Sequence, residues 1–160
     1  MRKEGPKMQQ KNAITVLHNL VDVYENACQP ICKEMGVPYT AFSILMFLAE
    51  NPEYYTAKDV SEFRAIKPNL VSFNVNKLVE EGYLERVPIP GNRRSIRLVC
   101  TEKAKPVVAK GRDIIQHFYL NLMKGMSEED IARFHGYMEL IGGNVMILKK
   151  TLEEGRKADV

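Results

Sequence analysis

Apolar residues recur at helical spacing along most of the chain, and two short segments alternate apolar with polar residues. Spacings of three and four predict helices over residues 10–36, 39–50, 56–63, 67–81, 101–124 and 127–152. Tyr83–Val87 and Ser95–Cys100 alternate as half-buried strands do, and the turn residues Pro88–Asn92 join them. The pattern predicts a mostly helical chain with a small β-hairpin.

Residues 56–82 are typical of two helices joined by a short turn. Thr56 and Asp59 form a capping box that starts the first helix, which is expected to end near Phe63. After the connection 64–66, Pro68 restarts a helix in a turn where no backbone amide is needed, and Gly82 supplies a left-handed stop. With the hairpin that follows, this layout predicts a winged helix-turn-helix, a DNA reader.

The second of these helices separates apolar from polar positions. Val71, Val75 and Leu78 are expected to face the core. Side chains that suit bases and phosphates of a major groove lie on the opposite face or at the helix start: Lys67, Asn69, Ser72, Phe73, Asn76 and Lys77. The alternative is an ordinary solvated face, which these residues alone would fit equally well.

The tip of the predicted hairpin is basic. It reads Asn92-Arg93-Arg94, and paired arginines on an exposed turn suit the minor groove or the adjacent phosphates, where a narrow groove concentrates negative potential. The alternative is a basic turn that is merely solvated. The helix-turn-helix that precedes it favours the DNA-binding interpretation.

Three segments resemble the MarR-type bacterial transcriptional regulators. Residues 66–72 lead into the recognition helix, residues 78–86 lead out of it, and the wing 92–95 leads into 98–101. In that family an acidic residue of the wing helps to orient the arginine two positions on. Here Asn92 stands in its place, so the resemblance carries over to Arg94 but not to that ion pair. The recognition-helix contacts that the resemblance implies fall on Asn69, Leu70, Ser72, Phe73 and Lys77, and the two apolar ones suit a thymine methyl group.

The helices near the two ends of the chain carry apolar stripes that would stay exposed to water in a monomer. The stripes follow heptad spacing through Ile14, Leu17, Val21, Tyr24, Cys28, Ile31 and Met35, and through Ile131, Phe134, Met138, Ile141, Val145, Leu148 and Leu152. We therefore expect a homodimer that presents two recognition helices about 34 Å apart. The predicted organisation is one domain, 1–160, with a helical dimerisation region (10–36 and 101–157) and a winged helix-turn-helix lobe (37–100).

Composition fits a small globular protein with local charge. The chain has 160 residues, 45% of them hydrophobic, and a net charge of only +3, which excludes a histone-like binder. No apolar region typical of a secretory signal follows the basic start, and the longest apolar run, Ile44–Ala49, is far too short to span a membrane. An odd number of cysteines, three, fits a reducing compartment. A cytoplasmic location without membrane contact is expected.

Other candidate chemistry is weaker. Cys28 and Cys32 are four residues apart, and some relatives in the MarR-type family sense peroxides through a cysteine of the first helix, yet Cys28 lies on the apolar stripe and core packing is favoured. The three histidines show no spacing that predicts a metal site. The sequence contains no phosphate-binding loop, nucleophile elbow or acid–base pair, so neither a cofactor nor an enzymatic activity is predicted.

The sequence thus predicts a DNA-binding regulator, most often a repressor in such families, that binds a pseudopalindromic operator as a homodimer. The resemblance also implies a small-molecule effector, often aromatic or phenolic, bound between the dimer helices and the reader. The alternatives are a winged-helix protein-interaction module that does not bind DNA and a redox-sensing regulator that uses Cys28 or Cys32.

Overall fold

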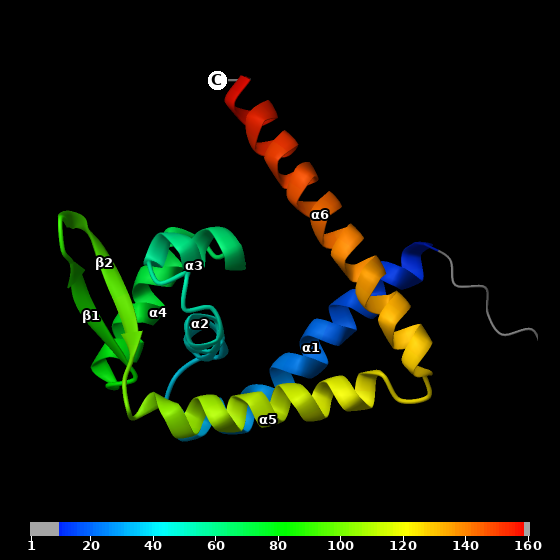
Figure 1. Ribbon diagram of the computed structural model, residues 1–160, viewed down its shortest axis with the longest axis horizontal. Coiled ribbons are helices and arrows are strands. Elements are labelled where there is room, and N and C mark those ends of the chain that lie inside the picture. The colour runs from blue at the N-terminus through cyan, green and yellow to red at the C-terminus, as the bar shows by residue number, and fades with distance from the viewer. Residues whose placement is uncertain (1–9, 159–160) are drawn as a thin grey trace, which may run out of the picture. The chain divides into compact units, whose positions relative to one another are not determined.

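The chain folds into helices and one antiparallel hairpin, as the sequence pattern predicts (Figure 1). The computed structural model describes residues 10–158, without the side chains of 10–13, 93, 94, 153 and 156–158. Within this range the elements are α1 (Gln10–Met35), α2 (Tyr39–Glu50), α3 (Ala57–Arg64), α4 (Pro68–Glu80), β1 (Leu84–Ile89), β2 (Asn92–Cys100), α5 (Ala104–Leu122) and α6 (Glu128–Ala158). The expected fold class, mostly helical with a β-hairpin wing, is confirmed.

Two compact units make up the chain, Met1–Phe118 and Tyr119–Val160. The first holds α1 to α4, the hairpin and most of α5. The second holds the end of α5 and α6.

The core of the first unit is built around α2. This helix contacts α1, α3, α4 and β2, and it lies at the centre of these elements in Figure 1. Phe42, Ile44 and Leu45 on α2 are at most 1% exposed, which places apolar groups on several sides of the helix. Burial of one such side chain stabilises a fold by about 1.5–3 kcal/mol. A helix that is apolar around its circumference therefore occupies the middle of the unit.

The other core residues come from the elements that surround α2. The second half of the α1 stripe packs here through Cys28, Ile31 and Met35, whereas its first half stays exposed. The core of the unit also takes in Val60, Val71, Val75, Leu78, Leu84 and Leu98. The predicted stripe of α1 therefore divides into a buried half and an exposed half.

A glycine permits α5 to approach α2 closely. A Cβ atom on Gly111 would lie 2.5 Å from the Sδ atom of Met46 and 3.1 Å from the ζ carbon of Phe42. Two exposed ion pairs hold α5 at the surface: Lys110 lies 2.6 Å from Glu34 of α1, and Arg112 lies 2.6 Å from Glu50 of α2. Exposed pairs contribute little to stability, so the close packing is the stronger restraint.

The hairpin is longer and its turn shorter than predicted. Leu84 pairs with Cys100 and Ile89 pairs with Asn92, with an irregularity between Pro88 and Ile89. The turn therefore consists of residues 90–91 and not of the predicted 88–92, and Gly91 takes its left-handed conformation at φ +79°. Pro88 fits within β1 because a strand at the edge of a sheet can leave backbone positions unpaired.

The fifth helix begins three residues later than predicted. Its expected first residue, Thr101, is held to the end of the reader because its hydroxyl donates to the carbonyl oxygen of Gly82 at 2.7 Å. Its backbone amide donates to the carbonyl oxygen of Tyr83 at 3.1 Å. Both contacts hold Thr101 outside the helix, and α5 starts at Ala104.

The second unit begins with the predicted signals. Gly125 has φ +88°, and a capping box starts α6: the Asp130 amide donates to the Ser127 hydroxyl at 3.1 Å, and the Ser127 amide donates to the Asp130 carboxylate at 3.4 Å. Its apolar stripe is largely exposed within the chain, Leu148 by 61% and Leu152 by 66%.

In the described part of the chain, no single helix is long and apolar enough to cross a membrane. Only α1 and α2 taken together reach the required length and composition, and a bend of 93° separates them. Most of α2 is buried in the protein itself.

Candidate nucleic-acid interface

The helix-turn-helix is fixed by short-range hydrogen bonds. The Asp59 amide donates to the Thr56 hydroxyl at 3.1 Å and the Thr56 amide donates to the Asp59 carboxylate at 2.8 Å, so the predicted capping box is present. The helix runs to Arg64, one residue past the expected end. Ala65 then turns the chain at φ +51°, and the Ser61 hydroxyl donates to the carbonyl oxygen of Ile66 at 2.7 Å. These contacts set the direction in which α4 starts.

The recognition helix, α4, buries one face and exposes the other. Val71, Val75 and Leu78 are buried as predicted. The exposed residues include Lys67, Asn69, Leu70, Ser72, Phe73 and Asn76. Phe73 is 65% exposed and Leu70 is 47% exposed, although both are large and apolar. Lys77 is only partly exposed and lies 3.5 Å from Glu81.

A buried asparagine on α4 was not foreseen. Asn74 is 4% exposed, and its side-chain amide donates to the carbonyl oxygen of Leu70 at 2.8 Å. Its side-chain oxygen has no hydrogen-bond partner among the described residues. The sequence pattern does not single it out, because one polar residue inside an apolar stripe does not interrupt the helical period.

The wing is joined to the segment before α3. The Leu98 amide donates to the carbonyl oxygen of Tyr55 at 2.8 Å, and the Arg97 guanidinium lies 4.9 Å from the centroid of the Tyr55 ring. Arg93 and Arg94 lie in β2, but their side chains are outside the described part of the structure. The side-chain amide of Asn92 donates to the Ser95 hydroxyl at 3.1 Å.

A groove of about 510 Å³ lies between the start of α3, the recognition helix and the wing. Its polar lining includes Lys58, Ser72, Asn76, Arg86 and Ser95. The Arg86 guanidinium donates a hydrogen bond to the side-chain oxygen of Asn76 and so joins β1 to α4. Neither Lys58 nor Arg86 was predicted as a site residue, because their proximity to α4 depends on how the wing packs against it.

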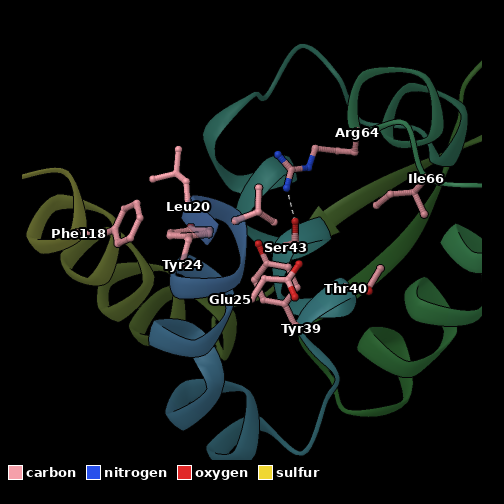
Figure 2. Close-up of a pocket in the computed structure, with 10 residues that line it drawn as sticks. Leu20, Tyr24, Glu25, Tyr39, Thr40, Ser43, Arg64, Ile66 and Phe118 are labelled. Carbon is pink, nitrogen blue, oxygen red and sulfur yellow. Dashed lines mark hydrogen bonds between the residues drawn. The ribbon is translucent and has the colours of Figure 1, made fainter. Parts of the chain in front are cut away.

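A second hollow, of about 520 Å³, lies between α1, α2, the end of α3 and α5 (Figure 2). Arg64 points from the end of α3 to the Ser43 hydroxyl and donates a hydrogen bond to it. The Tyr24 ring lies 5.2 Å from the Phe118 ring and 6.3 Å from the Tyr39 ring, measured between centroids. The hollow is thus lined by aromatic rings, by one guanidinium and by the Glu25 carboxylate.

The tyrosines of this hollow stay protonated at neutral pH. Burial raises the pKa of Tyr24 well above its usual range, and the nearby Cys28 adds to the shift. Burial also raises the pKa of Tyr39. Neutral phenols carry no charge but can donate hydrogen bonds. Arg64 is the cationic side chain that lines this hollow and could pair with an anionic ligand.

The two candidate redox cysteines lie in the core. Cys28 is 0% exposed and Cys32 is 2% exposed. Burial raises the pKa of both thiols, that of Cys32 to about 11 with a smaller contribution from Cys28. A buried thiol whose thiolate is disfavoured is a poor nucleophile, which favours the packing interpretation over redox sensing.

No group of three His, Cys, Asp or Glu side chains able to hold a metal ion occurs among residues 10–158 whose side chains are described. His135 accepts or donates a hydrogen bond with the Tyr119 hydroxyl at 2.7 Å. His117 contacts the carbonyl oxygen of Asp113 at 2.8 Å. Both histidines thus have local partners within α5 and α6.

The sequence and the fold of this chain are similar to those of known proteins. Residues 35–95 match the family model described as MarR family. A MarR transcriptional regulator from Methanosarcina mazei is similar with a TM-score of 0.77 at 19% identity, over 87% of this chain and 99% of that one. A MarR protein from Peptoclostridium difficile has a TM-score of 0.76 at 16% identity, over 91% and 94%. Wild-type MarR from E. coli in its apo form has a TM-score of 0.60 at 13% identity, over 79% and 94%.

These matches confirm the predicted resemblance. The matched residues include α2, the helix-turn-helix and the first half of the wing. The solved structures share the fold of nearly their whole length with this chain. The chain therefore has the fold of the MarR-type transcriptional regulators, and its residues 35–95 match that family's model.

Proposed function

From this MarR-type fold we propose that the protein is a transcriptional regulator that binds a pseudopalindromic DNA operator as a homodimer, most often to repress. The exposed face of α4 carries the proposal. Leu70 and Phe73 are large apolar side chains held in water next to Asn69, Ser72 and Asn76. Such a face suits base edges and thymine methyl groups in a major groove.

The groove beside α4 supplies the charge that DNA binding needs. Lys58 and Arg86 line it, and Lys67 is exposed at the start of the recognition helix. Arg93 and Arg94 add two positive charges to the wing sequence. Contacts from these side chains to phosphates would position α4, whereas its polar face would read the bases.

The exposed apolar stripes support the dimer. The first half of the α1 stripe is exposed, Ile14 by 58% and Leu17 by 52%, and Leu148 on the α6 stripe is exposed by 61%. An exposed apolar surface of this kind marks a site of association. In a dimer with two-fold symmetry, the same stripes of a second copy would cover them.

The hollow of Figure 2 supports an effector site. It lies between α1, α2, the end of α3 and α5, and it combines the Tyr24 and Phe118 rings with the Arg64 guanidinium. This combination suits a small aromatic compound that carries an anionic or phenolic oxygen. Binding there would alter the Arg64–Ser43 contact and thereby the position of α3.

Selection of bound fragments from genomic DNA, with and without aromatic acids, tests the regulator. One enriched sequence with two related half-sites is the expected result. Affinity for it should fall steeply with salt, because each phosphate contact releases counterions. Equal binding to the enriched sequence and to a shuffled control would contradict the proposal.

Binding that is absent at all salt concentrations would favour the alternative, a winged-helix module that contacts proteins. The basic groove and the polar face of α4 are the observations against that alternative.

A further inference from the structure

The hydrogen bond between Arg86 and Asn76 has a consequence for base recognition. It joins β1 of the wing to the exposed face of the recognition helix, ten positions apart in the chain. Both side chains line the groove between α3, α4 and the wing, together with Ser72 and Ser95. The pair therefore lies at the surface that the proposed function assigns to DNA.

The chemistry of the partners decides how the Asn76 side chain is oriented. A guanidinium has N–H donors only, so the atom of the Asn76 carboxamide that faces Arg86 must be its oxygen, as the structure has it. A carboxamide without such a partner can turn over and exchange its donor for its acceptor. The Arg86 contact removes that freedom and leaves the amide nitrogen of Asn76 as the group available to a ligand.

This orientation favours some bases over others. A free asparagine suits adenine, because it accepts from the adenine amino group and donates to N7. In the pair, the Asn76 oxygen already holds a cationic donor, and an approaching amino group would meet the positive charge of Arg86. Guanine presents two acceptors to the major groove, O6 and N7, and no amino group there.

We propose that Arg86 and Asn76 form a donor-only unit that selects guanine at one position of each operator half-site. The inference rests on the proposed DNA binding and deepens it. Asn76 is the residue that contacts the base, and Arg86 is a positioning residue that fixes the Asn76 carboxamide. Asn76 comes from α4 and Arg86 from β1 of the wing, so both elements are needed to specify this base.

Enrichment of a random duplex library by the full-length protein tests the unit. The wild type should enrich guanine at one position of each half-site. Asn76→Ala should lower that enrichment at the same position by about fivefold or more. Asn76→Asp replaces the donor by an acceptor while it keeps a partner for Arg86, and it should shift the preference toward cytosine, whose amino group donates.

Arg86→Met separates positioning from charge. It should lower the guanine-to-adenine ratio at that position by about fivefold, because the carboxamide regains its freedom to turn. Arg97→Met is the matched control, since Arg97 also lies in the wing but rests on Tyr55. It should weaken binding to all sequences and leave the base preference unchanged.

The outcomes distinguish the two proposals. A wild type that enriches no sequence would overturn the proposed function and this inference with it. A wild type that enriches a clear operator with the same base preferences in Asn76→Ala or in Arg86→Met would overturn only the donor-only unit. Thermal unfolding of each variant, with a transition like that of the wild type, shows that the changes are not caused by misfolding.

Discussion

Arg64, on the last turn of α3, donates a hydrogen bond to the Ser43 hydroxyl on α2, and this contact forms one wall of the hollow in Figure 2. It joins the first helix of the helix-turn-helix to the central helix of the core. Tyr24, Tyr39 and Phe118 line the same hollow. A ligand that competes with Ser43 for the guanidinium would therefore act directly on the position of the reader.

The first prediction concerns ligand binding by Arg64. Millimolar benzoate should raise the melting temperature of the wild type, because a carboxylate pairs with the guanidinium while its ring packs on Tyr24. Arg64→Met should bind benzoate about tenfold more weakly, since a charge-assisted hydrogen bond contributes about 1.5–3 kcal/mol. Calorimetric titration measures both proteins. Arg133→Met is the control, because Arg133 pairs with Glu129 on α6; an equal loss in that variant would contradict the site.

A second prediction concerns the wing. Arg94→Ala should weaken operator binding by about tenfold at physiological salt and should lower the salt slope by about one, as expected for one lost phosphate or minor-groove contact. Fluorescence anisotropy with a labelled duplex gives both values. The melting temperature should not change, because Arg94 belongs to the end of β2 beside the turn. Unchanged affinity would remove Arg94 from the interface.

Reading and positioning on α4 should be separable. Asn69→Ala or Ser72→Ala should reduce discrimination between operator and random DNA by about 1–3 kcal/mol. Lys67→Ala should weaken binding to both DNAs nearly equally and lower the salt slope by about one. Lys67 suits this comparison better than Lys77, which lies beside Glu81. If all three variants acted alike, the proposed orientation of α4 would be wrong.

The local features of the reader could be predicted from the sequence because each depends on neighbouring residues. The capping boxes of Thr56 and Ser127 and the left-handed glycines 82 and 125 need contacts only a few positions along the chain. The start of α5 could not be predicted, because Thr101 is held by Gly82 and Tyr83 across the reader. The turn of the wing differs from the prediction because strand pairing extends through Pro88.

Exposed residues of α4 could be predicted from the sequence, whereas contacts between separate elements could not. Periodicity identifies the exposed face of α4, since burial of Val71, Val75 and Leu78 determines the opposite face. It contains no information on Arg86, which meets Asn76 only because β1 folds back beside α4. Nor does it contain information on Arg64, whose partner Ser43 lies on another helix.

The buried thiols give a prediction on pH. The pKa of Cys32 is raised by burial from 9.0 to about 11, so the unfolded chain loses this proton at a lower pH than the folded chain does. The stabilisation is fully present below about pH 9 and is lost as the pH rises toward about 11, by about 1.4 kcal/mol per pH unit between these values. Urea unfolding at rising pH should show a smaller decline for Cys32→Val than for the wild type. Equal declines would mean that the thiol keeps its ordinary pKa in the fold.

The last prediction tests the dimer. Leu17 and Leu148 lie on the exposed stripes of α1 and α6, and replacement of either by Glu should break the dimer, because burial of an unpaired carboxylate costs several kcal/mol. Val23→Glu and Met146→Glu are the matched controls, since both residues are exposed apolar residues of the same helices but lie off the stripes. Sedimentation should give twice the chain mass of 18.3 kDa for the wild type and the controls, and the single mass for the stripe variants. Operator affinity should fall with dissociation, because one reader occupies one half-site and loses the effective concentration that the second reader provides. A wild type that sediments as a monomer and still binds a two-half-site operator tightly would contradict the dimer.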